Sequence, residues 1–188
     1  MSLDCGSDSG RRSASGPVEP GAGSVVAYIG VGSNKGEARE QCREALMRLG
    51  SHEGVAFLRH SSFYRSEPVG VADQDWFVNA VGEIRTALGP SELLGLLKTI
   101  EKSMGREEGK RWGPRIIDLD ILLYGQAVVD GPELVIPHRE LHRRRFVLVP
   151  LNELASYAIH PLYGLSVRGL LERCEDLHVV DLIGEGAG

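Results

Sequence analysis

Hydrophobic and polar residues alternate along the chain with two different periods, and these periods predict its secondary structure. Runs of β-branched and aliphatic residues, bounded by glycine, proline or polar residues, predict strands at 25–31, 55–65, 77–86 and 116–124. Apolar residues that recur every three or four positions predict helices at about 37–49 and 90–104. The order strand, helix, strand, strand, helix, strand is the split βαβ pattern of ferredoxin-like α+β folds. We therefore expect one antiparallel sheet with both helices on one face, the other face free for a ligand, and C-terminal additions.

The last predicted strand carries two carboxylates on one face. Because side chains alternate along a strand, one face holds Ile116, Asp118, Asp120 and Leu122, and the other holds Ile117, Leu119, Ile121 and Leu123. The second face is wholly aliphatic and belongs against the core, which puts the two aspartates on the free face. Their Cα atoms are expected roughly 6.5 to 7 Å apart, from a rise of ~3.3 Å per residue. Both carboxylates could therefore reach one cation or a pair of cations.

The remaining segments are less regular. Short strands are expected at 128–129 and 134–136, a turn at 137–138, a helical or extended connection at 146–154, a helix at 167–174 and an edge strand at 177–182. Residues 1–23 are dominated by Gly, Ser, Pro and Asp and are expected to form a disordered tail, because they cannot bury enough surface to offset their ordering entropy. Residues 184–188 are expected to fray. The folded domain is expected over 24–183.

The composition is that of an ordinary protein with a sizeable core. Of 188 residues, 42% are hydrophobic and 25% are charged, and the formal net charge of −5 argues against a protein that coats nucleic acid. Three cysteines, far apart and without CxxC spacing, favour reduced thiols in a cytoplasmic protein. No apolar run approaches the ~20 residues of a membrane helix, and we expect neither a membrane span nor a secretory signal. Nothing in the sequence demands more than a monomer.

Basic residues are concentrated on either side of the aspartate strand. Six lie between positions 98 and 115, against three acidic residues, and a second cluster follows at Arg139, Arg143, Arg144 and Arg145. Either cluster alone is more typical of a solvated face than of a binding site. Together with two strand carboxylates, however, they supply what phosphoryl transfer requires, namely a held cation and donors aimed at phosphate oxygens. The absence of His or Cys beside the carboxylates favours Mg²⁺ over zinc.

Other polar residues have a structural and a functional interpretation. Gly32-Ser33-Asn34 lacks the spacing and the lysine of a phosphate-binding loop, which favours a structural turn. Asn79, in the middle of a strand, is either an edge residue facing water or a ligand contact, and the sequence does not decide between the two. Trp76 is expected to anchor its loop. We expect surface or core roles for His52, His60, His142, His160 and His178, because none shares metal-ligand spacing with another.

A specific resemblance narrows the chemistry. The segment Arg111-Trp112-Gly113-Pro114-Arg115-x-x-Asp118-Leu119-Asp120 resembles the signature of the 6-hydroxymethyl-7,8-dihydropterin pyrophosphokinase family. Further matches, over roughly 24–182, are Gly32-Ser33-Asn34, Ser61-Ser62-Phe63-Tyr64-Arg65, Phe77-Val78-Asn79-Ala80, Gly105-Arg106, Pro137-His138 and Arg144-Arg145-Phe146. The resemblance implies transfer of pyrophosphate from MgATP to the hydroxymethyl group of the pterin, with release of AMP, in folate biosynthesis.

The resemblance also implies a role for each matching position. Asp118 and Asp120 are expected to hold two Mg²⁺ ions on the phosphates of ATP, and Arg106 and Arg115 to grip these phosphates as catalytic residues. Pterin contacts are expected at Ser66, Val69, Phe77, Asn79, Trp112 and Phe146. ATP contacts are expected at Lys98, Glu101, Arg106, Lys110, Trp112, Arg115, Ile121, His138, Arg139 and Arg144.

The chain departs from the family pattern at a few positions. The loop from Gly105 to Trp112 is one residue short, and its second arginine position holds Glu107 or Glu108, so that Lys110 is the candidate substitute. Phe77 stands where tyrosine is frequent, Glu67 replaces a proline, and Arg139 replaces an aromatic residue near the adenine. None of these changes touches the aspartate pair.

Two other functions fit parts of the pattern. A ferredoxin-like nucleic-acid-binding module would use aromatic and basic residues on its open sheet face. However, Asp118 and Asp120 on that face repel phosphate without a metal ion, and the strands lack an RNP-type aromatic pattern. A metal-dependent phosphohydrolase could use the same carboxylates, and the substrates consumed would distinguish it from a transferase.

Overall fold

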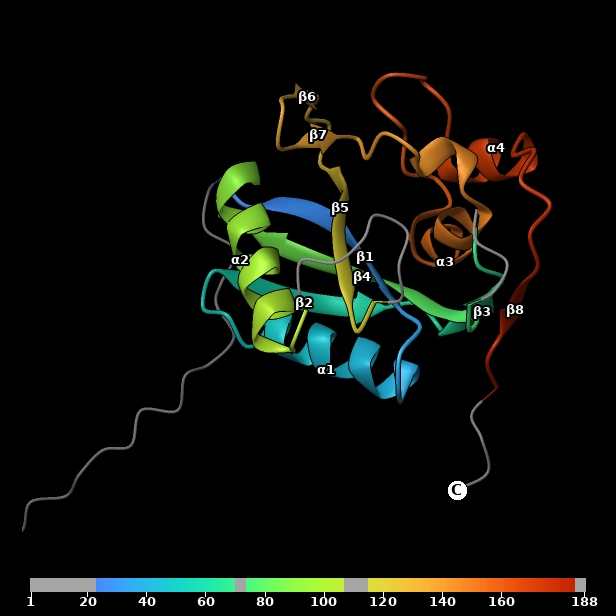
Figure 1. Cartoon of the computed structure of the whole chain (residues 1–188). Helices are drawn as coiled ribbons and strands as arrows, with labels where there is room; N and C mark the ends of the chain where they lie inside the picture. Colours follow the sequence, from blue (N-terminus) through green and yellow to red (C-terminus); the bar gives the residue numbers. More distant parts are fainter. Residues whose placement is uncertain (1–22, 70–73, 107–114, 185–188) are drawn as a thin grey trace, which may run out of the picture.

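A six-stranded antiparallel sheet forms the centre of the protein (Figure 1), whose computed structural model describes residues 23–69, 74–106 and 115–184. Its strands are β1 (Val25–Ser33), β2 (Val55–His60), β3 (Tyr64–Ser66), β4 (Phe77–Thr86), β5 (Asp118–Tyr124) and β8 (Val180–Leu182). The order along the sheet is β5-β1-β4-β3-β8, and β2 also pairs with β4. All of these pairings are antiparallel, with β1 between β4 and β5. This is the ferredoxin-like arrangement that the sequence predicted.

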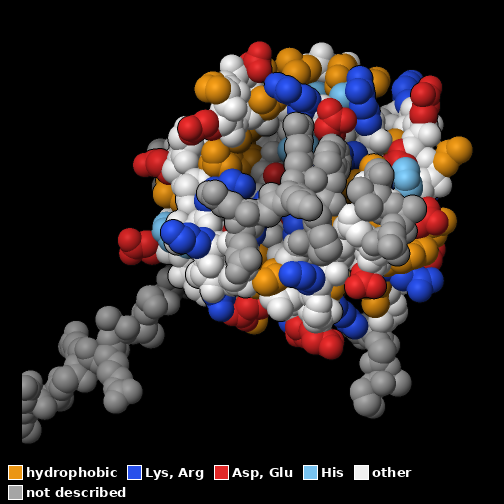
Figure 2. Space-filling model, viewed as in Figure 1, with side chains coloured by type: hydrophobic (Ala, Val, Ile, Leu, Met, Phe, Trp, Pro, Cys, Tyr) orange, Lys and Arg blue, Asp and Glu red, His pale blue; other side chains and the backbone are white. Residues whose placement is uncertain are grey.

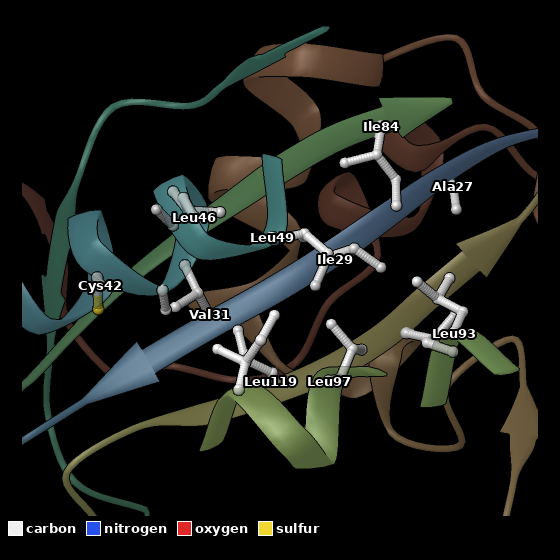
Figure 3. Packing of buried hydrophobic residues seen from close by; sticks show 14 of the residues in the cluster. Ala27, Ile29, Val31, Cys42, Leu46, Leu49, Ile84, Leu93, Leu97 and Leu119 are labelled. Atoms are coloured by element: carbon white, nitrogen blue, oxygen red, sulfur yellow. The ribbon is translucent and has the colours of Figure 1, made fainter. Parts of the chain in front are cut away.

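Two long helices cover one face of the sheet, as predicted. They are α1 (Ala38–Gly50), which follows β1 in the sequence, and α2 (Pro90–Ser103), which follows β4. Their apolar stripes pack on the sheet: Figure 3 shows Leu46 and Leu49 of α1 and Leu93 and Leu97 of α2 against Ile29 of β1. All five side chains are buried. This core fixes the position of β1, and therefore of β4 and β5 beside it.

The prediction of one continuous strand over 55–65 is wrong. It divides into β2 and β3, which pair with successive parts of β4. At the break, the buried Ser61 side chain takes the place of a backbone partner: the Val81 amide donates to Ser61 Oγ at 2.9 Å, and the Ser61 amide donates to the Val81 carbonyl at 2.8 Å. The adjacent Phe63 turns into the core. A side chain that replaces a ladder hydrogen bond leaves the hydrophobic period almost unchanged, so the sequence did not show the break.

The second face of the sheet is free only in part, which corrects the prediction. Helices α3 (Arg145–Ala155) and α4 (Val167–Glu172) cover one region of it and form a second core with strand residues such as Val81 and Leu122. The connection at 146–154 is thus helical. The uncovered region of this face lies beside α3 and contains the site described below.

In the aspartate strand, residues up to Leu122 lie on the predicted faces of the sheet, but Leu123 lies on the opposite face from the one predicted. The register between β1 and β5 shifts by one residue, because Ile29 pairs with Ile121 whereas Tyr28 pairs with Leu123. Such a β-bulge adds one residue to a strand and changes the face of those that follow it. Leu123 therefore joins Leu122 in the second core instead of facing α1 and α2.

The C-terminal additions agree with the predicted order of elements. Short strands β6 (Val129–Asp130) and β7 (Val135–Ile136) form a separate hairpin, a cis peptide bond precedes Pro137, and a 3₁₀ turn (Leu141–Arg143) leads into α3. Strand β8 then adds to the sheet beside β3 (Figure 1). Within the described ranges, no helix is long and apolar enough to cross a membrane. The predicted tails fall almost entirely outside the described residues, at 1–22 and 185–188.

Candidate active site

A cavity of about 630 Å³ opens on the face of the sheet opposite α1 and α2. Its walls come from β1, β3, β4 and β5, the end of α2, the start of α3 and the segment before β8. Of the predicted site residues, it collects Ser66, Val69, Phe77, Asn79, Lys98, Arg106, Arg115, Asp118, Asp120, His138, Arg144 and Phe146. Figure 2 shows Lys and Arg side chains interspersed with Asp and Glu side chains on the face of the molecule presented in Figure 1. Residues that are distant in sequence thus meet in one cavity with charges of both signs.

Two glycines of β1 form the floor of this cavity. Gly30 pairs with Asp120 and Gly32 with Asp118 on one side, and Gly32 pairs with Asn79 on the other. A Cβ atom at Gly32 would lie 3.0 Å from Asn79 Oδ1, closer than almost all real contacts of a Cβ atom. Asn79 and Asp118 are therefore two strand spacings apart, about 10 Å, and Gly32 between them adds no side chain to the floor. A flat molecule can lie on such a floor.

The two aspartates have different surroundings. Asp118 accepts a hydrogen bond from Arg106 Nη1 at 2.7 Å and forms a second ion pair with Arg115. Among the described residues, no arginine forms an ion pair with Asp120. Burial, followed by the nearby Asp118 carboxylate, raises the pKa of Asp120. A positive charge placed between the two carboxylates would offset both effects.

Glu101 lies beneath this pair and lines neither this cavity nor the second one described below, in contrast to its predicted contact with ATP. Its side chain is 2% exposed. It accepts a hydrogen bond from the Leu119 amide at 2.7 Å and forms ion pairs with Arg106 and with Lys98 Nζ, the latter at 3.2 Å. Glu101 therefore holds the arginine and the aspartate strand together from behind. Burial raises the pKa of Glu101, and the Leu119 bond and the two cations oppose that shift.

Asn79 faces the cavity and not bulk water. Its side chain is almost fully buried, and its Nδ2 donates to Ser66 Oγ at 2.8 Å, from β4 to β3. The alternative of an edge asparagine in solvent is thus wrong. Phe77 lies two residues before Asn79 on β4, and Phe146 enters the same cavity from the first turn of α3. The Arg144 guanidinium lies 5.7 Å from the Phe146 ring centroid.

A second cavity of about 230 Å³ adjoins the first. The two share Lys98, Asp120 and His138, and the second adds Ile121 and Arg139 from the predicted ATP contacts. His138 is anchored by its backbone amide, which donates to the Leu122 carbonyl at 3.0 Å. Burial lowers the pKa of His138, and the Asp120 carboxylate opposes that shift. Asp120, one member of the aspartate pair, therefore stands at the junction of the two cavities.

Asn34 fixes the base of the loop that carries Arg115. Its backbone amide donates to the Arg115 carbonyl at 3.2 Å, and its Oδ1 accepts from the Arg115 amide at 2.8 Å. Its Nδ2 also donates to Gln74 Oε1 at 3.3 Å and to the Asp75 carbonyl at 3.4 Å. The prediction of a structural turn is wrong for Gly32 and Ser33, which are the last residues of β1. Asn34 follows the strand directly, and its side chain joins it to two further segments.

Comparison with known proteins decides the family. Residues 28–156 match the family model of 7,8-dihydro-6-hydroxymethylpterin-pyrophosphokinase. A 2-amino-4-hydroxy-6-hydroxymethyldihydropteridine pyrophosphokinase of Haemophilus influenzae is 44% identical over 73% of this chain and 86% of its own length. The chain belongs to this pyrophosphokinase family. The prediction of a pyrophosphokinase of folate biosynthesis is confirmed at this level.

Some further relatives are longer proteins, of which this chain matches a part. The mitochondrial folate synthesis bifunctional protein of Arabidopsis thaliana is 44% identical over 84% of this chain, which spans 29% of that protein. A Plasmodium falciparum HPPK-DHPS crystal structure matches with a TM-score of 0.65 at 15% identity, over 80% of this chain and 45% of that one. This second likeness concerns the fold alone.

Some site residues of this pyrophosphokinase were missed or lie outside the described part of the chain. Asp176 and His178 line the first cavity, a location that the sequence did not predict. The His178 side chain is 41% exposed, which agrees with the expectation of a surface histidine. No local signal marks them, because only the pairing of β8 with β3 brings them to the cavity. Trp112 and Lys110, like Glu107 and Glu108, lie outside the described residues. Trp76 lines neither cavity and packs against Arg65, 5.1 Å from its ring centroid, as a loop anchor would.

Proposed function

We propose that this pyrophosphokinase transfers pyrophosphate from MgATP to the hydroxymethyl group of 6-hydroxymethyl-7,8-dihydropterin and releases AMP. One observation carries the proposal: a single cavity brings together an aspartate pair, two arginines directed at it, and two phenylalanines with a buried asparagine. The first group suits polyphosphate, and the second suits a flat heterocycle with hydrogen-bonding edges.

The residues present fit Mg²⁺ at the aspartate pair. Asp118 and Asp120 supply carboxylate oxygens, the donors that Mg²⁺ prefers. Within residues 23–69, 74–106 and 115–184, no group of three or more His, Cys, Asp and Glu side chains could hold a metal ion. That agrees with Mg²⁺ because this ion is commonly held by one or two carboxylates, phosphate oxygens and water. When bound, two such ions would neutralise charge that develops on the transferred phosphates.

The pterin end of the cavity is proposed to bind by stacking and edge recognition. Phe77 and Phe146 would stack on the ring, while Asn79 and the Ser66–Val69 stretch would hydrogen-bond to its edge. Ser66 holds the Asn79 amide in place through the 2.8 Å bond. Gly32 keeps the floor clear between this end and Asp118. The ring is thereby oriented with its substituent toward the aspartates, and such positioning is a large part of phosphoryl-transfer catalysis.

The ATP end is proposed to extend from the aspartates into the second cavity. Ile121, His138 and Arg139 line that cavity and would contact the nucleoside, while Lys98 stands between the two cavities. Arg106, Arg115 and Arg144 line the first cavity and would hold phosphate oxygens. Trp112 and Lys110, which lie outside the described residues, are proposed as further ATP contacts.

The proposed reaction is a direct displacement at the β-phosphorus. The hydroxymethyl oxygen attacks and forms the new O–P bond, the bond from this phosphorus to the oxygen bridging to the α-phosphorus breaks, and AMP leaves with that oxygen. The hydroxyl proton is released to water. Arg106 and Arg115 stabilise the negative charge that develops on the transferred group.

Incubation with ATP, Mg²⁺ and the hydroxymethyl-dihydropterin tests this function. AMP that forms only with pterin supports transfer, inorganic phosphate formed without pterin indicates a phosphohydrolase, and no turnover refutes both. Asp118→Asn and Asp120→Asn should each lower kcat by more than about 100-fold, since even residues behind metal ligands cost 10- to 100-fold. Asp130→Asn, an exposed aspartate on β6, is the matched control and should leave the rate unchanged.

We also propose a cytoplasmic monomer. Cys42 and Cys174 are free thiols, as in a reducing compartment. Size-exclusion chromatography with light scattering should give the mass of one chain, 20.4 kDa, and a mass of twice that value would refute the monomer.

A further inference from the structure

The C-terminal segment from Asp176 to β8 forms one wall of the first cavity. It lies beyond residues 28–156, which match the family model. Strand β8 pairs with β3, so that Val180 lies opposite Ser66. The next residues are joined in both directions: the Glu67 amide donates to the Val179 carbonyl at 3.3 Å, and the Val179 amide donates to Glu67 Oε2 at 2.9 Å. These bonds hold the segment against the edge of the cavity that contains Ser66.

Asp176 fixes the imidazole of His178 within this wall. The Asp176 side chain is 9% exposed. Its Oδ2 accepts from the Arg145 amide at the start of α3 at 2.8 Å, and its Oδ1 accepts from the His178 amide at 3.0 Å. The same Oδ1 lies 2.5 Å from His178 Nδ1. With Nδ1 bound to a carboxylate, the neutral ring carries its proton there, and Nε2 is left as an acceptor.

Sheet order places His178 far from the reacting phosphates. The path β5-β1-β4-β3-β8 has four strand spacings, and β5 and β8 are at its opposite ends (Figure 1). At about 4.8 Å each, these spacings separate the two strands by about 19 Å. His178, two residues before β8, therefore faces the end of the cavity opposite Asp118 and Asp120. That end contains Ser66, whose hydroxyl holds Asn79.

We propose that His178 is a specificity residue for the pterin, with Asp176 as the residue that positions it. His178 Nε2 accepts a hydrogen bond from an N–H group of the ring, on the side away from the hydroxymethyl group. Within the described residues, Nε2 has no other hydrogen-bond partner. The proposal rests on the proposed function, because it names a further contact to the same substrate. It implies that His178 contributes to pterin binding and leaves the transfer step unchanged.

Steady-state AMP formation separates these effects. For His178→Ala we expect KM for the pterin to rise about tenfold, the typical effect of one lost hydrogen bond. Both kcat and KM for ATP should stay within about twofold of wild type. His178→Gln, which retains an acceptor, should restore part of the loss. His52→Ala is the control, because the His52 imidazole is likewise held by a local hydrogen bond, which its Nδ1 accepts from the Gly54 amide, in a turn remote from the cavity.

The role of Asp176 is tested by combining a substitution at Asp176 with one at His178. If it acts through His178, Asp176→Asn should raise KM for the pterin in the wild-type background and have no further effect on it in His178→Ala. A His178→Ala enzyme with unchanged KM for the pterin, or with kcat lowered as much as kcat/KM, would refute the role of His178 while leaving the proposed function standing. A wild-type protein that neither binds pterin in calorimetry nor forms AMP would refute the proposed function itself.

Discussion

Replacement of Glu101 tests how the aspartate strand is supported from behind. Glu101→Ala removes a buried carboxylate and leaves the Leu119 amide, 2.7 Å from Oε1, without its acceptor. An unpaired buried donor costs about 1–3 kcal/mol, and loss of the one buried methylene, Cγ, adds about 0.8 kcal/mol. We therefore expect a loss of about 3 kcal/mol in the free energy of unfolding. For a chain of this length that corresponds to a fall in Tm of about 6–12 °C.

Glu101→Gln should behave differently. The amide oxygen can still accept from Leu119, and the raised pKa of Glu101 indicates that its buried charge is itself unfavourable. Arg106 also keeps its bond to Asp118, at 2.7 Å. We therefore expect Glu101→Gln to lie within about 1 kcal/mol of wild type.

Urea unfolding followed by far-UV circular dichroism measures both variants. Glu44→Ala is the matched control, because Glu44 forms a 2.7 Å pair with Arg48 on the surface of α1, with both side chains more than 40% exposed. Such a pair contributes at most about 1 kcal/mol. An Ala variant of Glu101 as stable as this control would show that the buried bond to Leu119 is not a major contribution. Equal losses in the Ala and Gln variants would show that charge pairing dominates.

Three further measurements follow from the geometry. Gly32→Ala should raise KM for the pterin and leave KM for ATP unchanged in the AMP assay, because the new Cβ would lie 3.0 Å from Asn79 Oδ1; equal changes in both would contradict this. Gly82→Ala should lower the free energy of unfolding, measured in urea, by about 1–3 kcal/mol, because its Cβ would lie 2.9 Å from a core leucine, whereas Gly95→Ala in α2, with open space around it, should not be destabilising. The pKa of Asp176 is lowered despite burial, by hydrogen bonds from backbone amides and from His178, so its contribution to stability is present above the ordinary value of 3.8 and lost as pH falls below it. Asp176→Asn should flatten the pH dependence of unfolding in that acidic range, and an unchanged slope would contradict the assignment.

Local periodicity was enough to predict the bounds of β4 and α2. Strand β4, flanked by β1 and by β2 and β3, was predicted from Phe77 to Thr86 as observed, and α2 differs by about one residue. The break in 55–65 was not predictable in this way, since it depends on a bond from Ser61 to Val81, which is 20 residues away in the chain. The face of Leu123 depends likewise on the register with β1, which is a property of the pair of strands and not of β5 alone.

In the candidate site, too, the sequence predicted what depends on local periodicity and missed what depends on tertiary packing. The common face of Asp118 and Asp120 follows from the period of a strand, and the sequence predicted it correctly. The burial of Glu101 behind that strand, and the arrival of His178 from the C-terminal segment, are consequences of tertiary packing. The spacing of three residues on α2 predicts that Glu101 lies close to Lys98. It does not predict that β5 packs against Glu101.

Asn34 makes two parts of the site energetically dependent on each other. Its single side chain bonds the Arg115 amide through Oδ1 and the Gln74–Asp75 stretch through Nδ2. Substitutions at groups that share a partner do not add, and the free energy of interaction between them can be as large as either single effect. A change that weakens the hold on Gln74 therefore alters the hold on Arg115. Substitutions around Gln74 and around Arg115 are therefore constrained jointly, because both segments depend on one asparagine.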